Sequence, residues 1–252
     1  MNPHAMEPFG AALLAWFEGH AISELVVRRD DGTESPLPVG YFFREQADFT
    51  PLEMEALSLC RGHVLDVGAG TGLHSKALQS KEIPVTAIDI SPQAVAIMKQ
   101  RCVKDVYLAD IFEFRDRRFD TILMLGHGIG MVETMAGLDR FLVNSSALLT
   151  IDGQMLLDSL DVRITDDPAN LAYHESNRKA GRCIGEIRMQ FEFQGKRGPF
   201  CGWLQVDADT LRDHAVSAGW NCEIVCRESN GNYLARLSRS TPGREFSGVH
   251  QS

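Results

Sequence analysis

The sequence has few of the features that mark metal-binding, secreted or membrane proteins. Its six cysteines form no C-x-x-C pair and no zinc-ligand spacing, and several stand in apolar runs, as buried free thiols do. No apolar run reaches the roughly 18 residues that a membrane helix needs, and the first residues lack the charged and apolar regions of a secretory leader. We therefore expect a cytoplasmic protein with reduced thiols, no metal and no membrane partner.

The chain also lacks an excess of positive charge. It has 25 Lys and Arg against 34 Asp and Glu, which gives a formal net charge of −9. No general basic field is available to attract a phosphate backbone, so we expect no nucleic-acid partner. An apolar fraction of 44% in 252 residues suits one large α/β domain with an elaboration.

A glycine-rich turn in segment 64–73 lacks the dinucleotide-binding spacing G-x-G-x-x-G, because Leu73 or Ser75 stands where the last glycine would be. Instead the turn reads D-x-G-x-G-x-G, beginning at Asp66. An apolar run precedes it and a helix-compatible stretch follows, which places it at the carboxyl end of a strand, where open α/β sheets bind nucleotides. The carboxylate favours a cationic ligand over a pyrophosphate, because like charges repel. The alternative interpretation of these three glycines is a simple tight turn.

Two more acids end later apolar runs. Asp89 lies 21 residues after Gly68, where adenosine-binding α/β folds place an acid for the ribose hydroxyls. Asp110 follows after another 21 residues. The alternatives are that Asp89 is an acid favoured by a helix N-terminus and that Asp110 is a solvated loop residue.

These three motifs, together with the apolar run 118–125 and the loop 126–130 after it, resemble the class I S-adenosylmethionine-dependent methyltransferases over residues 60–160. The resemblance implies an α/β fold with a Rossmann-like, doubly wound, seven-stranded sheet whose last strand is antiparallel. It implies S-adenosylmethionine as cofactor and S-adenosylhomocysteine as product. It places Asp66 near the ammonium group, Asp89 on the ribose and Asp110 on the adenine amino group. The full implied cofactor set is Asp66, Gly68, Ala69, Gly70, Gly72, Asp89, Ile90, Asp110, Ile111 and Leu125.

Methyl transfer requires orientation of the partners and removal of a proton. His127 is the main candidate for the base, because histidine titrates near neutral pH and this loop passes beside the methyl group in related folds. The alternative is that His127 only shapes a flexible loop. Glu133 and Tyr233 are weaker candidates. No Asn-Pro-Pro-Tyr, Asp-Pro-Pro-Tyr or Pro-Cys motif is present, so we expect an oxygen or nitrogen of a small metabolite to accept the methyl group.

Three parts of the chain are expected. Residues 1–50 form an N-terminal cap or lid, with 1–8 flexible and a helix over 10–18. Residues 51–238 form the methyltransferase domain, with an irregular stretch at 160–182 and an inserted β-hairpin at about 183–206. Residues 239–252 form a flexible tail.

The expected substrate-binding residues lie in the cap, the hairpin and the last strand. They are Tyr41, Phe42, Phe43, Arg44, Trp203 and Tyr233. The aromatic residues of the cap serve either as a lid over the site or as plain packing.

Two other functions compete with methyl transfer: an inert module that binds S-adenosylmethionine and regulates a partner, and an aminopropyl transferase on the same fold. A nicotinamide oxidoreductase is disfavoured by the glycine spacing.

Overall fold

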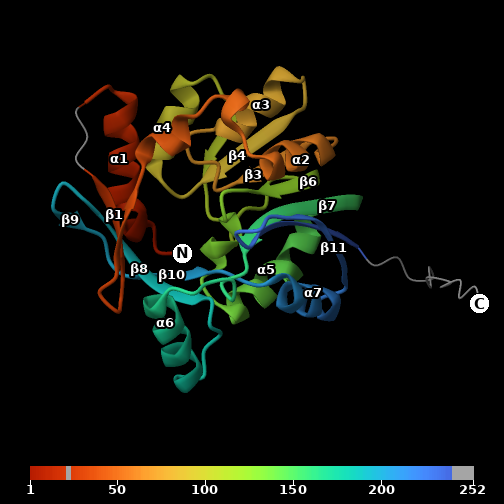
Figure 1. Cartoon of the computed structure of the whole chain (residues 1–252). Coiled ribbons are helices and arrows are strands. Elements are labelled where there is room, and N and C mark those ends of the chain that lie inside the picture. The colour runs from red at the N-terminus through yellow and green to blue at the C-terminus, as the bar shows by residue number, and fades with distance from the viewer. Residues whose placement is uncertain (21–23, 240–252) are drawn as a thin grey trace, which may run out of the picture.

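A seven-stranded sheet forms the centre of the computed structural model, which describes residues 1–20 and 24–239 (Figure 1). In spatial order the strands are β11 (Trp220–Arg227), β12 (Asn232–Arg239), β7 (Leu149–Leu160), β6 (Phe119–Met124), β3 (Val64–Val67), β4 (Val85–Asp89) and β5 (Asp105–Leu108). The strands from β7 to β5 run parallel, whereas β12 is antiparallel to both β7 and β11. The predicted α/β fold with its antiparallel last strand is confirmed.

Helices cover both faces of this sheet (Figure 1). One face carries α2 (Pro51–Leu59), α3 (Leu73–Ser80) and α4 (Pro92–Gln100), and the other carries α5 (Met135–Leu148) and α7 (Ala208–Ser217). Neighbouring strand residues point to opposite faces. Leu156 and Leu234 therefore pack with α2 and α3, while Leu157 and Ala235 pack with α5 and α7. Both faces of the sheet are buried under helices, as is usual for a parallel sheet.

A second sheet lies beside the first. It contains β1 (Leu25–Arg29), β2 (Glu34–Leu37), β8 (Glu186–Phe193), β9 (Lys196–Arg197) and β10 (Cys201–Leu204). The predicted hairpin forms as β8 and β10, which pair antiparallel. Strand β8 also pairs with β1, so that Val27 lies opposite Phe191. The hairpin and the N-terminal cap thus form one sheet, a long-range pairing that the sequence analysis did not predict.

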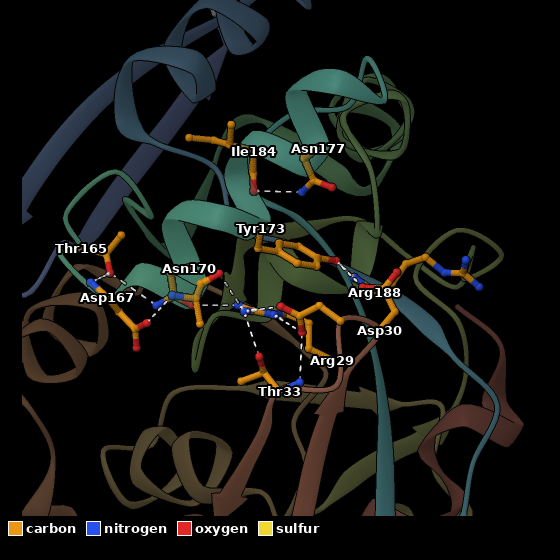
Figure 2. Close-up of polar contacts among 12 residues, drawn as sticks. Arg29, Asp30, Thr33, Thr165, Asp167, Asn170, Tyr173, Asn177, Ile184 and Arg188 are labelled. Atoms are coloured by element: carbon orange, nitrogen blue, oxygen red, sulfur yellow. Dashed lines mark hydrogen bonds and ion pairs between the residues drawn. The ribbon is translucent and has the colours of Figure 1, made fainter.

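The stretch 160–182 was expected to be irregular, but it contains α6 (Pro168–Lys179). Figure 2 shows how this helix is attached to the second sheet. The Tyr173 hydroxyl donates a hydrogen bond to Asp30 at 2.8 Å, and the Arg29 guanidinium lies 4.3 Å from the centre of the Tyr173 ring. These contacts hold a mostly polar helix that has little apolar surface to bury.

The start of the chain is also more ordered than expected. Residues 1–8 were predicted to be flexible, yet they contain η1 (Pro3–Met6) and the start of α1 (Glu7–Phe17), and the Ala5 side chain is fully buried. Proline is compatible with the first turn of a helix, so Pro8 allows α1 to begin before residue 10. At the other end, Arg239 still belongs to β12, and residues 240–252 of the predicted tail lie outside the described residues.

Candidate active site

A cavity of about 300 Å³ opens at the carboxyl edge of the central sheet, where it meets the second sheet and the N-terminal segment. Three short 3₁₀ helices lie in the neighbouring segments. They are η2 (Val39–Phe43) and η3 (Gln46–Asp48), between β2 and α2, and η4 (Gly128–Val132), between β6 and α5. Loops after β3, β4, β5 and β6 supply one side of the lining. Carboxyl ends of parallel strands are where such sheets bind ligands.

The glycine turn after β3 borders this cavity through Gly68, Ala69 and Gly70. Gly68 has φ 68° and Gly70 has φ 57°, a left-handed backbone that glycine adopts at little cost. A Cβ built on Gly70 would meet no atom nearer than 4.0 Å, so the turn faces open space. Gly72 instead caps the start of α3 and does not line the cavity.

Asp66 does not reach the cavity surface. Its side chain is buried and accepts a hydrogen bond from the Ser75 hydroxyl at 2.6 Å. Burial raises the pKa of this carboxyl. The predicted contact between Asp66 and the ligand is therefore corrected: Asp66 lies behind the turn and fastens it to α3.

Asp89 ends β4 and lines the cavity. Its two carboxylate oxygens accept hydrogen bonds from the backbone N–H groups of Gly70 at 2.9 Å and Ser91 at 2.8 Å. Burial raises the pKa of Asp89, while these two hydrogen bonds act in the opposite direction. The carboxylate is thus held rigidly between the glycine turn and the start of α4.

Asp110 and its apolar neighbours form the next part of the lining. The Asp110 carboxylate accepts a hydrogen bond from Phe112 N at 2.8 Å, and its other oxygen lies 3.4 Å from the amino group of Met1. Ile90, Ile111 and Leu125 border the same cavity. These predicted residues are therefore brought together.

His127 follows β6 and also lines the cavity. Its backbone φ of 58° is unusual for a residue other than glycine. Its backbone N–H donates to Asp158 at 2.8 Å, and its ring Nε2 lies 2.9 Å from the side-chain oxygen of Asn232. Burial raises the pKa of Asp158 to about 6, against the influence of His127. Asp158 and Asn232, which lie near the end of β7 and at the start of β12, were not predicted as site residues.

An ion cluster supports the cap side of the cavity. The buried Glu53 carboxylate accepts hydrogen bonds from His74 and Arg44, both at 2.9 Å, and from Thr50 N at 2.8 Å. Burial alone would raise the pKa of Glu53, but these bonds outweigh it and hold the pKa at about 2. The Arg44 guanidinium stacks 3.7 Å above the Tyr41 ring. Arg44 lines the cavity as predicted, but its charge is already paired with Glu53.

Much of the remaining lining is apolar and comes mainly from the second sheet and the N-terminal segment. It includes Met6, Phe9, Val27, Leu37, Phe42, Met131, Met189, Phe191 and Trp203. Tyr41, Phe42 and Trp203 were predicted to face substrate, and all three line the cavity. Most of the others were not predicted. Val27, Met189 and Phe191 come from β1 and β8, which pair with each other although they are far apart in the sequence.

Three predicted residues lie elsewhere. Phe43 points away and stacks on Trp16, with ring centres 6.3 Å apart. Tyr233 is only 1% exposed, and its hydroxyl donates to the Val206 carbonyl at 2.6 Å. Burial raises the pKa of Tyr233 well above its usual range, so it cannot serve as a base or a substrate contact. Glu133 ends η4 outside the cavity lining.

Comparison with known proteins identifies the family. Residues 64–153 match the family model described as "Methyltransferase domain". The chain is 33% identical to an S-adenosylmethionine-dependent methyltransferase from Bacteroides fragilis, solved in complex with S-adenosyl-L-homocysteine; the match covers 96% of this chain and 98% of that one, with a TM-score of 0.83. The chain therefore belongs to the S-adenosylmethionine-dependent methyltransferases, which confirms the predicted family and cofactor.

Two more distant proteins also match this chain. The demethylmenaquinone methyltransferase of Tropheryma whipplei (strain Twist) is 28% identical over 121 residues, which are 46% of this chain and 49% of that protein. The chain thus spans about half the length of the curated relatives it matches. The sugar N-methyltransferase KedS8 from a Streptoalloteichus species is 17% identical, covers 83% of this chain and 96% of its own, and has a TM-score of 0.55, which shows the shared fold alone.

Two classes of feature are not found in the described part of the chain. No helix within residues 1–20 and 24–239 is both long and apolar enough to cross a membrane. Over the same residues, no three or more His, Cys, Asp or Glu side chains come together as a metal site.

Proposed function

We propose that this chain transfers a methyl group from S-adenosylmethionine to an oxygen or nitrogen of a small molecule with an apolar body. One observation carries the proposal: a single cavity has the glycine turn, Asp89 and Asp110 on one side and apolar side chains of the second sheet on the other. His127 belongs to the same lining. A cofactor and an acceptor can therefore meet in one cavity.

The residues at the sheet edge fit the cofactor. Each Asp89 oxygen has a lone pair left after its backbone hydrogen bond, so the carboxylate can accept both hydroxyls of a ribose. We assign Asp110 to the adenine amino group, with Ile90 and Ile111 against the ring. The turn at 68–70 would hold the methionine part. When bound, S-adenosylmethionine supplies an electrophilic methyl group on a positively charged sulfur.

The chain's own residues then have two tasks. The first is to orient the acceptor, which the apolar lining does by burying its body, at about 25 cal/mol per Å² of apolar surface. Arg44 is paired with Glu53, so the lining favours a neutral acceptor over an anionic one. The second task is to remove a proton from the acceptor atom, which we assign to His127.

The test uses S-adenosylmethionine labelled on the methyl group and a metabolite extract. We expect label in the fraction that passes a small-molecule filter and partitions into an organic solvent. Demethylmenaquinone is one pure acceptor to include, because the curated relatives are named for it. A quinone carries no O–H or N–H, so label on it would show transfer to carbon and would contradict an oxygen or nitrogen acceptor. Gly70→Val is the control: a side chain there would occupy the cofactor's approach.

Other outcomes would replace the proposal. Label in tRNA, rRNA or a protein band, with none in the filtrate, would show that the methyl acceptor is a macromolecule and not a small molecule. Tight binding of S-adenosylhomocysteine without transfer to any fraction would favour the inert regulatory module. Transfer of an aminopropyl group from the decarboxylated cofactor would favour the other rival enzyme.

A further inference from the structure

The loop that carries His127 is held on two sides. The backbone N–H of His127 donates a hydrogen bond to Asp158, and the His127 ring is hydrogen-bonded to Asn232. A positive φ is unfavourable at a residue other than glycine and persists only where its surroundings enforce it. The contacts around His127 therefore fix the position of its ring beside the cavity.

Three side chains form a line that ends at His127. The Asn232 side-chain nitrogen lies 3.2 Å from a carboxylate oxygen of Glu228, and the Asn232 side-chain oxygen lies 2.9 Å from His127 Nε2. An ionised carboxylate only accepts hydrogen bonds, so the Asn232 amide must turn its NH₂ group toward Glu228. Its oxygen then faces His127 and also accepts. Nε2 must therefore be the ring nitrogen that carries the proton.

A neutral imidazole carries one proton, so Nδ1 of His127 is left with a lone pair. Within the described part of the chain, Nδ1 makes no hydrogen bond, and it is not among the buried polar atoms that lack a partner. This nitrogen is therefore not sealed inside the protein, and His127 is one of the residues that line the cavity where an acceptor would bind.

The topology explains why these residues meet. Strand β12 is antiparallel to β7, so it begins at the edge where β6 and β7 end. Asn232 is its first residue and pairs with Leu160. The turn before it is closed by backbone hydrogen bonds from Glu228 N to Asn232 O at 2.7 Å and from Gly231 N to Glu228 O at 3.1 Å. Glu228 is thereby fixed relative to Asn232.

We propose that Asn232 and Glu228 are positioning residues that hold His127 in its Nε2–H form and present Nδ1 to the cavity as the proton acceptor. The catalytic meaning rests on the proposed function, whereas the tautomer is a property of the protein alone. In the transfer step, the acceptor oxygen or nitrogen forms its bond to the methyl carbon as the carbon–sulfur bond breaks. The proton of the acceptor atom passes to Nδ1. The acceptor must therefore carry an O–H or N–H.

Other charged and titratable groups lie near this ring. Asp158 on β7 interacts with His127, and Asp158 is in turn linked electrostatically to the Arg44–Glu53–His74 cluster and to the Tyr41 hydroxyl. A test must therefore change the partner of Nε2 and leave these groups in place.

The first measurement is the tautomer of His127 by ¹⁵N–¹H correlation of the histidine rings, with the signal assigned from its loss in His127→Asn. We expect neutral His127 to carry its proton on Nε2 in the wild type. In Asn232→Leu, which cannot accept the bond, we expect a mixture of the two tautomers. A wild-type ring protonated on Nδ1 would overturn the proposal without any assay of activity.

The second measurement is the pH midpoint of the His127 ring in the same spectra. Asn232→Asp places a carboxylate against Nε2, which favours the charged imidazolium and should raise the midpoint by about one unit or more. Asn230→Asp is the matched control: it keeps the oxygen that accepts from Asn232 N, and it adds the same charge in the exposed turn, where solvent screens it. An equal shift in both variants would refute a direct contact.

Turnover completes the test. If His127 is the base, the rate rises as His127 loses its proton, so Asn232→Asp should move that rise to higher pH and preserve a plateau above it. A merely structural role would lower the rate at every pH and leave the midpoint in place. If the tautomer is Nε2–H but no acceptor is methylated, the proposed function fails and the positioning of His127 stands.

Discussion

Replacement of Asp89 by alanine tests the cofactor site most directly. Its carboxylate is fixed by Gly70 N and Ser91 N, and it keeps one lone pair on each oxygen for a ribose hydroxyl. Each hydrogen bond to a charged group contributes about 1.5–3 kcal/mol. Part of this is offset, because burial already disfavours the ionised carboxylate in the free protein. We expect a net loss of about 2–4 kcal/mol, which is roughly 30- to 1,000-fold in affinity.

The assay is calorimetry with S-adenosylhomocysteine and with its 2′-deoxy and 3′-deoxy analogues. The wild type should lose about tenfold or more in affinity for each missing hydroxyl, whereas Asp89→Ala should lose little further. This coupling separates a direct contact from a general disturbance of the site. Asp116→Ala removes an acid of the same charge on the surface and should bind like the wild type. The unfolding temperature checks that each variant is folded.

Two results would refute the reasoning. An unchanged affinity in Asp89→Ala would remove this carboxylate from the ligand site. An equal loss for the deoxy analogues in both proteins would show that the ribose hydroxyls bind elsewhere. Either result would undermine the assignment of the cavity's sheet-edge side to the cofactor.

Three further predictions concern the rest of the cavity. His127→Asn, which tolerates positive φ, should lower kcat by on the order of 10²–10⁴ and leave the affinity for S-adenosylhomocysteine unchanged by calorimetry. Gly130→Ala should raise the KM for the acceptor and spare cofactor binding, because a Cβ there would lie 2.1 Å from the Trp203 ring and push it into the cavity. Glu53→Gln should lower the free energy of unfolding at pH 7 by roughly 3 kcal/mol, since the folded pKa of Glu53 is lowered to about 2. This difference should be present above the unfolded pKa of about 4.5 and vanish as the pH falls toward 2, as measured by denaturant titration.

The sequence could predict that the glycine turn, Asp89 and Asp110 come together at one cavity, because the signals for them are local. A strand, a turn and the start of a helix lie within a few residues of one another. The spacing of Gly70 and Asp89 in the sequence is therefore enough to predict where they lie in the fold. Asp66 shows the limit of such reasoning. The spacing placed the acid near the ligand, but the side chain turns to Ser75 behind the turn.

The acceptor side could not be predicted in the same way. Alternation of apolar residues shows that β8 is half-buried but does not show which strand it pairs with. The three aromatic residues at 41–43 also mislead. In a 3₁₀ helix consecutive side chains point in directions about 120° apart, so Tyr41 and Phe42 face the cavity while Phe43 faces Trp16.

Two neighbouring residues of β12, Asn232 and Tyr233, also differ from what the sequence suggested. Tyr233 has the more conspicuous chemistry, but a strand alternates its faces, and this position points into the core. Asn232, one residue earlier, stands at the edge of the sheet and contacts His127. An asparagine directly after an Asn-Gly turn is an ordinary turn signal, so nothing in the sequence marks it as part of a site.

The two sides of the cavity come from different parts of the chain. A related protein is therefore informative only about the side that its match covers. The family match at 64–153 covers the loops after β3 to β6, and these loops form the side of the cavity that we assign to the cofactor. The apolar side depends on β1 and β8, which lie outside that match. The Bacteroides fragilis structure, which aligns over 96% of this chain, is therefore informative about both sides. A protein that matches 46% of the chain can share the cofactor chemistry and still bind a different acceptor, because strand pairing between distant segments shapes that half of the cavity.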